Sequence, residues 1–87
     1  MAKYKVIFKQ SVRKDLRSIP NIDIKRILQK IEQIAEHPRG QGSVKLKGSN
    51  YFRVRQGQYR IVYEIRDQEL IITVIKVGHR SSVYSQH

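Results

Sequence analysis

The period of the apolar residues changes from helical to alternating midway along this chain, and that change limits the fold more than any other feature. Between Ile24 and Ala35 apolar residues recur at the spacing of one helix face. Between Tyr51 and Val77 they alternate with polar residues, which is typical of half-buried strands. Helices with one apolar face must pack on another layer, and the strands supply it. The sequence therefore predicts an α+β fold.

Capping residues and helix breakers bound the first half of the chain. Residues 3–9 alternate as a first strand. A first helix follows, with Ser11 as its expected cap and Pro20 as its stop. Asn21 is expected to cap a second and longer helix that ends at His37.

The second half of the chain predicts a loop over residues 39–50 and then a three-stranded meander. The strands are expected over residues 51–55, 58–66 and 69–77, with two-residue turns at Gln56-Gly57 and Asp67-Gln68. The element order is β-α-α-β-β-β, in a single domain over residues 1–87. We expect two antiparallel helices packed on one face of a small, mainly antiparallel sheet.

The chain is strongly basic, and its charges are unevenly placed. Eighteen Lys and Arg against seven Asp and Glu give a formal charge of +11. Such a charge favours a polyanionic partner such as a nucleic acid. The interval between Glu36 and Glu64 holds no acidic residue and carries six basic ones: Arg39, Lys45, Lys47, Arg53, Arg55 and Arg60. The charges of the amino-terminal half, of both signs on helical patterns, are those of an ordinary solvated surface.

Strand register brings three of these arginines together. A turn at Gln56-Gly57 pairs Arg53 with Arg60, and Arg55 shares their face because residues two apart point the same way. Like charges opposite one another are unfavourable, which indicates a site for an anion. The same register places an apolar section on this face, formed by Val62, Ile71, Thr73 and Ile75. Exposed apolar patches of this kind usually mark partner sites, and the alternative is that the chain's own residues after Val77 cover this section.

Composition argues against several classes of protein. The chain has no cysteine, and therefore neither disulfides nor thiolate metal sites. His37, His79 and His87 are too dispersed to predict a zinc site, and no phosphate-binding glycine loop is found. We expect no metal and no cofactor. The apolar run of residues 6–8 is too short for a signal sequence or a membrane span, so a cytoplasmic location is expected.

Three motifs, in this order along the chain, resemble those of the RelE/ParE toxin superfamily. They are Lys45-Leu46-Lys47-Gly48, the strand Tyr59-Arg60-Ile61-Val62-Tyr63, and Val77-Gly78-His79-Arg80 followed by Val83-Tyr84. The order of strands and helices agrees over nearly the whole chain. The resemblance to the RelE branch implies a toxin that cuts mRNA in the ribosomal decoding site. It also implies that the RNA 2′-hydroxyl is the nucleophile, that no metal is needed, and that a cognate antitoxin blocks the toxin.

The resemblance also implies a role for each residue of the site. Arg60 is expected to stabilise the dianionic phosphorane, since guanidinium groups form charge-assisted bonds to phosphate oxygens. Arg80 corresponds to the position that assists the leaving group, and Tyr84 to the aromatic residue on which a codon base stacks. The basic residues expected to bind the substrate beside them are Lys45, Lys47 and Arg53.

The general base departs from the family pattern. Arg55 stands where well-described members carry a lysine, and an arginine side chain stays protonated near neutral pH. His79 is the preferred alternative, since histidine titrates near neutrality, and Glu64 on the arginine face is the other. In a third possibility the arginines act only electrostatically. The sequence leaves the base unassigned.

Two other functions remain open. One is that of the ParE branch, which shares the fold and inhibits DNA gyrase without catalysis, and the other is RNA binding without catalysis. The arginines favour the nuclease, because a gyrase inhibitor has no use for a phosphorane-binding cluster. The expected partners are the ribosome with its mRNA and an acidic, partly disordered, RelB-like antitoxin that covers the apolar section of the arginine face. Codon preference and the stoichiometry of the complex cannot be inferred from the sequence.

Overall fold

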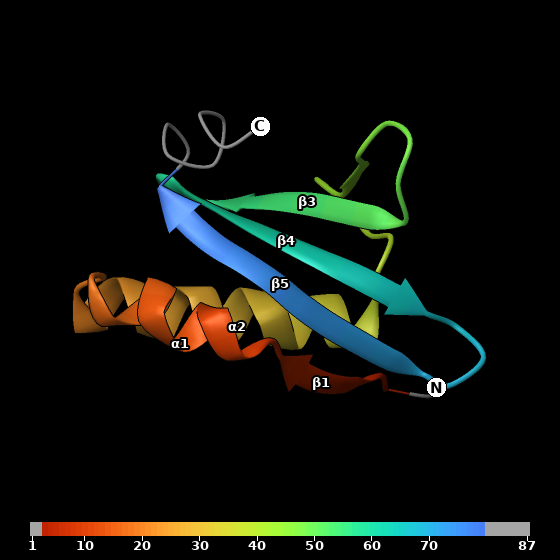
Figure 1. Ribbon diagram of the computed structural model, residues 1–87, viewed down its shortest axis with the longest axis horizontal. Helices are drawn as coiled ribbons and strands as arrows, with labels where there is room; N and C mark the ends of the chain where they lie inside the picture. The colour runs from red at the N-terminus through yellow and green to blue at the C-terminus, as the bar shows by residue number, and fades with distance from the viewer. Residues whose placement is uncertain (1–2, 80–87) are drawn as a thin grey trace.

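The computed structural model describes residues 3–79, which form two helices and five strands. In chain order these are β1 (Lys5–Phe8), α1 (Gln10–Arg17), α2 (Asn21–Glu36), β2 (Val44–Lys45), β3 (Tyr51–Gln56), β4 (Tyr59–Arg66) and β5 (Ile71–His79). The chain runs outward along α1 and returns along α2, and both helices pack on the sheet (Figure 1). The predicted α+β class and element order are confirmed, with β2 as an addition.

The five strands form one mixed sheet in the order β1-β5-β4-β3-β2. The pairs β2–β3, β3–β4 and β4–β5 are antiparallel, whereas β1 pairs with β5 in parallel. A parallel pair needs a long crossover between its strands, and here the connection includes both helices. The strand β2 was predicted as loop, because a two-residue strand is too short to show an alternating pattern.

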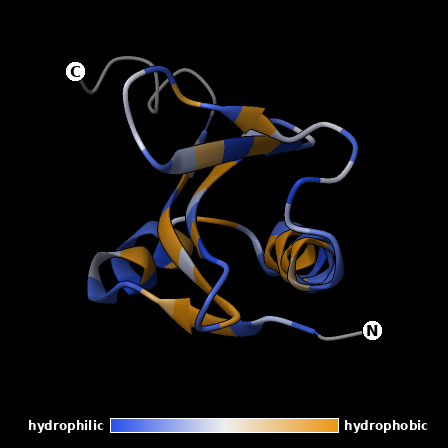
Figure 2. Cartoon of the chain, turned by 90° about the vertical axis from the view of Figure 1, so that its right-hand side faces the viewer, coloured by the Kyte–Doolittle hydropathy of each residue, from blue (hydrophilic) through white to orange (hydrophobic). Residues whose placement is uncertain are grey.

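The core lies between the helices and one face of the sheet. Apolar side chains of both helices meet those of β3, β4 and β5 there. Figure 2 shows hydrophobic stretches, in orange, along both the helices and the strands. The buried members are Val12, Ile19, Ile27, Ile31, Ile34, Val54, Ile61, Tyr63, Ile72, Val74 and Val77. Burying an aliphatic side chain of this size contributes roughly 1.5–3 kcal/mol, so this cluster is the main stabilising term. Leu28, which shares the helical period, is instead 41% exposed.

The β3–β4 turn lies one residue later than predicted. Gly57 and Gln58 form it, and the pairs that follow are Gln56 with Tyr59, Arg55 with Arg60, and Val54 with Ile61. Gly57 has a φ of 60°, and a hairpin turn with positive φ at its first central position favours glycine there. Moving the turn by one residue moves each cross-strand partner by two. The assignment of residues to the two faces is therefore confirmed, while the predicted Arg53–Arg60 pair is wrong.

The helix starts also differ from those predicted. The first helix begins at Gln10, so Ser11 lies inside it, and the capping position is Lys9 without a side-chain hydrogen bond. Pro20 occupies the capping position of the second helix, which places Asn21 in its first turn. Proline fixes a backbone angle that suits a helix entrance, and its missing amide costs nothing there.

Side-chain hydrogen bonds attach both helices to the sheet. Asp15 of α1 accepts hydrogen bonds from the Lys76 ammonium at 3.1 Å and from the Val77 backbone amide at 3.2 Å. The Tyr59 hydroxyl of β4 donates to Asp23 of α2 at 2.9 Å, and this bond raises the pKa of Tyr59. Both acidic residues thus have structural partners.

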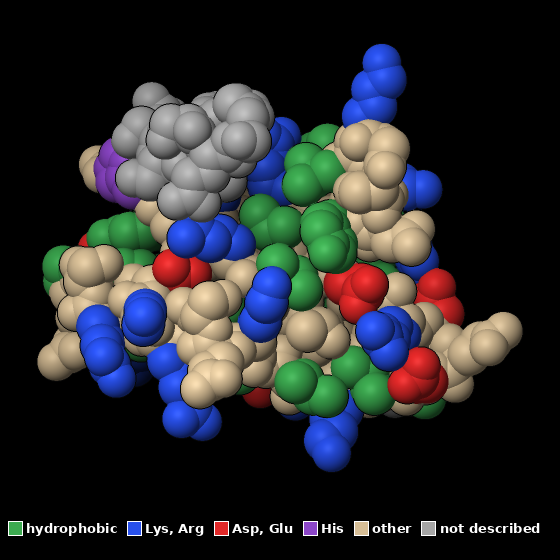
Figure 3. Space-filling model, in the orientation of Figure 1, with side chains coloured by type: hydrophobic (Ala, Val, Ile, Leu, Met, Phe, Trp, Pro, Cys, Tyr) green, Lys and Arg blue, Asp and Glu red, His purple; other side chains and the backbone are tan. Residues whose placement is uncertain are grey.

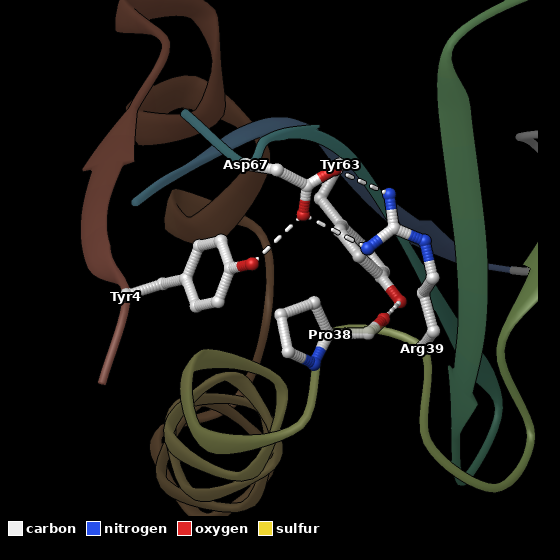
Figure 4. A network of polar contacts seen from close by, with 5 residues as sticks. All are labelled: Tyr4, Pro38, Arg39, Tyr63 and Asp67. Carbon is white, nitrogen blue, oxygen red and sulfur yellow. Dashed lines mark hydrogen bonds and ion pairs between the residues drawn. The ribbon is translucent and has the colours of Figure 1, made fainter. Parts of the chain in front are cut away.

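A network around Asp67 connects three parts of the chain that are distant in sequence (Figure 4). Arg39 donates two hydrogen bonds to the Asp67 carboxylate, at 2.9 and 2.8 Å, and the Tyr4 hydroxyl donates a third at 2.8 Å. These bonds lower the pKa of Asp67 to about 2. Beside them, the buried Tyr63 hydroxyl donates to the Pro38 carbonyl at 2.7 Å. The network fixes the β4–β5 turn against the loop that follows α2.

The β4–β5 turn is longer than the predicted Asp67-Gln68 turn. It spans residues 67–70, and Leu70 takes a φ of 55°. The alternating pattern extends across Glu69 and Leu70, which is why the sequence assigned them to the strand. The length and apolar character that a membrane crossing requires are found in neither helix of residues 3–79.

Candidate RNA-binding face of the sheet

One face of the sheet is turned away from the helices, and we call it the outer face. Strand register arranges its residues in rows that cross the sheet. One row holds Arg55, Arg60 and Gly78 from β3, β4 and β5. The next holds Val44, Arg53, Val62 and Lys76, and a third holds Tyr51, Glu64 and Thr73. The rows place cationic groups at one end of the face.

Arg53, Arg55 and Arg60 form what we call the arginine cluster. Arg55 lies directly opposite Arg60, and residues directly opposite on antiparallel strands have Cβ atoms about 4.5–5.5 Å apart. Arg53 lies two residues before Arg55 on the same strand, so it points to the same face, roughly 7 Å away. The prediction that these arginines share one face is confirmed. Three arginine side chains that leave one face at neighbouring positions suit a phosphate or a phosphorane.

The arginines of the cluster differ in exposure. Arg55 is exposed and Arg53 is half-buried, whereas Arg60 is 1% exposed. The β5 neighbour of Arg60 is Gly78, and a glycine within a strand leaves space for an adjacent group. Contact between a phosphate and the Arg60 guanidinium requires that this side chain become more exposed than it is here.

The apolar section of the outer face adjoins the arginine cluster. Val62 is 7% exposed, while Ile71, Thr73 and Ile75 are half-buried. The register shifts between Val62 and Tyr63, so that Ile75 has no direct partner on β4. Figure 3 shows hydrophobic side chains over the middle strands beside Lys and Arg side chains. The predicted combination of a basic end and an apolar section on one face is thus present, although Val62 contributes little exposed surface.

The two lysines predicted to bind substrate lie in β2 and in the turn that follows it. Lys45 of β2 pairs with Phe52, whose ring packs on the core, so the register places Lys45 on the helix side of the sheet. Lys47 is exposed in the turn between β2 and β3. Lys45 therefore lies on the opposite face of the sheet from the arginine cluster.

His79 is also placed apart from the arginine cluster. It pairs with Tyr59 across β4 and β5, and the two rings are in edge contact with centroids 6.0 Å apart. Its Nε2 atom lies 3.1 Å from the Gln58 side-chain oxygen. His79 lines a small cavity together with Asp15, Ser18 and Ile19 of the first helical segment. Its ring therefore lies on the helix side of the sheet end, across the sheet from Arg55 and Arg60.

Glu64 shares the outer face but is far from Arg60. They are four positions apart on β4, so their Cα atoms are roughly 13 Å apart in a strand. Its carboxylate accepts a hydrogen bond from Arg66 Nε at 3.1 Å. Proton transfer requires hydrogen-bond contact, so Glu64 could act on a hydroxyl near a phosphate held by Arg60 only with both side chains extended along the sheet. Of the three sequence alternatives for the base, the electrostatic one fits the geometry best.

Two predicted site residues, Arg80 and Tyr84, lie outside the described residues. Sequence reasoning did not single out Tyr51, which stands on the outer face next to Arg53 and is 38% exposed. Because Tyr51, Arg53 and Arg55 alternate along one predicted strand, the sequence pattern already places Tyr51 on the face of the arginines. An aromatic residue at a strand start was read only as a sign of β structure.

The arrangement defines a small basic α+β domain with a cationic site on the outer face of its sheet. Comparison with known proteins assigns the family. The family described as "ParE toxin of type II toxin-antitoxin system, parDE" matches residues 6–84. The chain therefore belongs to the RelE/ParE superfamily of toxins from type II toxin–antitoxin systems.

Individual relatives and structures agree with this assignment. Toxin RelE3 of Methanocaldococcus jannaschii is 34% identical over 89 residues, covering 92% of this chain and 94% of the relative. The mRNA interferase toxin RelE of Escherichia coli K12 is 30% identical, and the match covers 95% of this chain and 92% of that relative. A chain of the archaeal RelE–RelB complex from Pyrococcus horikoshii OT3 superposes with a TM-score of 0.79 at 27% identity, covering 92% of this chain and 97% of that one. A mutant of E. coli RelE in the free state also gives a TM-score of 0.79 at 27% identity, and the match covers 97% of this chain and 93% of that one.

Proposed function

We propose that this RelE-like toxin is a ribosome-dependent endoribonuclease that cleaves mRNA in the decoding site without a metal or cofactor. The 2′-oxygen attacks the adjacent phosphorus and the bond to the 5′-oxygen breaks. The products are a 2′,3′-cyclic phosphate and a 5′-hydroxyl. The 2′-hydroxyl proton passes to solvent, and the leaving 5′-oxygen takes a proton from solvent, a step that the resemblance to the family assigns Arg80 to assist.

The arginine cluster carries this proposal. The phosphorane has one more negative charge than the phosphodiester, so fixed positive charges lower its energy more than that of the ground state. Arg60 is the proposed centre of this stabilisation, with Arg55 opposite it and Arg53 on the adjacent row. The name of the E. coli relative, mRNA interferase toxin RelE, supports the same reaction class.

The proposed mechanism has no neutral side chain as its base. Arg55 cannot accept a proton at neutral pH, His79 lies on the helix side of the sheet end, and Glu64 is roughly 13 Å away along β4. Positive charge near the 2′-hydroxyl favours its ionised form, so the arginine cluster assists deprotonation by solvent. This assignment replaces the histidine that the sequence favoured.

A RelB-like antitoxin is the proposed regulatory partner. Solved structures similar to this chain include RelE–RelB complexes from P. horikoshii and Methanococcus jannaschii. The formal charge of +11 favours an acidic partner, and the apolar section beside the arginine cluster offers it a surface to bury. The ribosome and its mRNA in the cytoplasm are the proposed target.

The test is codon-resolved cleavage of mRNA on translating ribosomes, in the presence and absence of EDTA. Arg60→Met removes the charge and keeps the length of the side chain, so it leaves no large cavity. Loss of one electrostatic donor costs about 10²–10³ in rate, and we expect a loss at least as large while thermal unfolding stays cooperative. Cleavage by this variant at the wild-type rate would refute the assignment.

A second candidate function is inhibition of DNA gyrase, because the matching family is described by the name ParE. Supercoiling by purified gyrase distinguishes the two functions. We expect the wild-type toxin to leave supercoiling unchanged. Inhibition of supercoiling without mRNA cleavage would replace the nuclease by the ParE-type function.

A further inference from the structure

Tyr51 is set apart from the other tyrosines of the described residues by its surroundings. The hydroxyls of Tyr4, Tyr59 and Tyr63 donate hydrogen bonds to Asp67, Asp23 and the Pro38 carbonyl, respectively. Within residues 3–79 the Tyr51 hydroxyl has no hydrogen-bond partner, and the side chain is not part of the core cluster. The residue is 38% exposed. The fold therefore gives the Tyr51 ring no structural task.

The backbone of Tyr51 is nevertheless firmly held. Its amide donates to the Ser49 hydroxyl at 3.2 Å, and its carbonyl accepts from the Leu46 amide at 2.8 Å. Its position opposite Glu64 on β4 directs the ring to the outer face. An exposed aromatic ring on a fixed backbone is a preorganised surface for a planar ligand.

The position of Tyr51 relative to the arginine cluster identifies the ligand. Tyr51, Arg53 and Arg55 occupy alternate positions of β3, so all three lie on the outer face at intervals of roughly 7 Å. A cationic track beside an aromatic platform is the arrangement by which proteins bind single-stranded nucleic acids. An RNA strand whose phosphates follow Arg55 and Arg53 brings a base over Tyr51 within a few nucleotides.

The geometry points to Tyr51 as a base-stacking subsite for the mRNA, which positions the strand and does not take part in the chemistry. This inference rests on the proposed nuclease function and adds a binding residue to it. A stacked base contributes ~1–3 kcal/mol, and every base has a face that can stack. Tyr51 should therefore strengthen binding with little dependence on sequence.

The experiment is single-turnover cleavage on programmed ribosomes over a range of toxin concentrations. Tyr51→Val keeps the strand preference and removes the ring. We expect the half-saturating concentration to rise about 5- to 150-fold with the maximal rate unchanged, from the stacking energy of one base. Tyr51→Phe should behave as the wild type. Val44→Thr is the matched control, because Val44 lies on the same face in the Arg53 row and is 46% exposed without a ring.

An abasic nucleotide, moved through the positions around the scissile bond, makes the test specific for stacking. At one position the abasic nucleotide should raise the half-saturating concentration as much as Tyr51→Val does. The abasic mRNA and Tyr51→Val together should raise it no more than either change alone. Additive losses at every position, or wild-type behaviour of Tyr51→Val, would overturn the inference.

A binding measurement separates this inference from the nuclease proposal. A single-stranded oligoribonucleotide with 2-aminopurine is titrated with the wild type and with Tyr51→Val, and the fluorescence of the base reports stacking. Because Tyr84 is also expected to stack a base, the 2-aminopurine is moved through each position of the oligonucleotide. If the wild type quenches it at one position where Tyr51→Val does not, the subsite stands even where no cleavage is found. If the wild type cleaves mRNA but Tyr51→Val quenches as strongly as the wild type at every position, the nuclease stands and the subsite fails.

Discussion

Arg55 and Arg60 lie directly opposite each other on adjacent antiparallel strands, on the sheet face turned away from the helices. Two like charges in this position repel each other, so the pair does not contribute to folding. Arg60 is also 1% exposed. An anion bound beside both guanidinium groups would offset the repulsion between them.

Replacing Arg55 with glutamine should therefore have opposite effects on stability and activity. We expect the free energy of unfolding to rise by about 0.2–1 kcal/mol, the range for a cross-strand pair, while cleavage slows. Denaturant titration and single-turnover cleavage measure the two effects. Arg66→Gln is the control, because Arg66 is exposed on the same strand as Arg60 but contacts Glu64 and Glu69. That control should not gain stability, and a gain equal to that of Arg55→Gln would contradict the repulsion argument.

Acid should weaken the network around Asp67. The Arg39 and Tyr4 hydrogen bonds lower the pKa of Asp67 to about 2 from its ordinary value of 3.8. A carboxylate whose pKa is lower in the folded state stabilises it above pH 3.8, and this contribution is lost as the pH falls through about 2. Asp67→Asn should thus be less stable than the wild type near pH 6, with the difference shrinking toward pH 2.

The measurement for Asp67 is urea unfolding of both proteins across this pH range at low and high salt. The ion pair is half exposed, so salt should reduce the difference near pH 6. A difference that stays constant from pH 6 to pH 2 would show that the asparagine acts through packing and not through charge.

The attachment of α1 to β5 depends on Asp15. Asp15→Ala leaves the Val77 amide without its acceptor, in a residue that is 1% exposed, and should cost ~1–3 kcal/mol of unfolding free energy. Asp15→Asn keeps an acceptor oxygen and should recover part of that loss. Lys76→Met removes the ion pair alone and should cost at most ~1 kcal/mol. Equal losses for Asp15→Ala and Lys76→Met would assign the effect to charge instead of the amide.

The faces of the sheet were predictable from the sequence, whereas the partners across it were not. An error of one residue in the turn at Gly57 shifts each cross-strand partner by two positions. Because side chains alternate with a period of two, every arginine still lies on its predicted face. The Arg39–Asp67–Tyr4 network joins residues from three segments, and no local pattern reports it. The helix-side position of His79 depends on the β4–β5 register and its shift between Val62 and Tyr63, which a sequence does not reveal.

The placement of His79 leads to a prediction about the pH dependence of cleavage. A histidine base would make the rate level off above the pKa of its imidazole, and His79→Gln would remove that feature together with most of the activity. If the arginine cluster acts electrostatically, no side chain accepts the 2′-hydroxyl proton, and the logarithm of the cleavage rate rises with pH through this region. His79→Gln should then keep the same slope and a rate close to the wild type. Single-turnover rates between pH 6 and 9 on ribosomes saturated with toxin test this, and Arg60→Met at each pH serves as the inactive control. A plateau that disappears in His79→Gln would return the base to His79 and would require its ring to reach the outer face during the reaction.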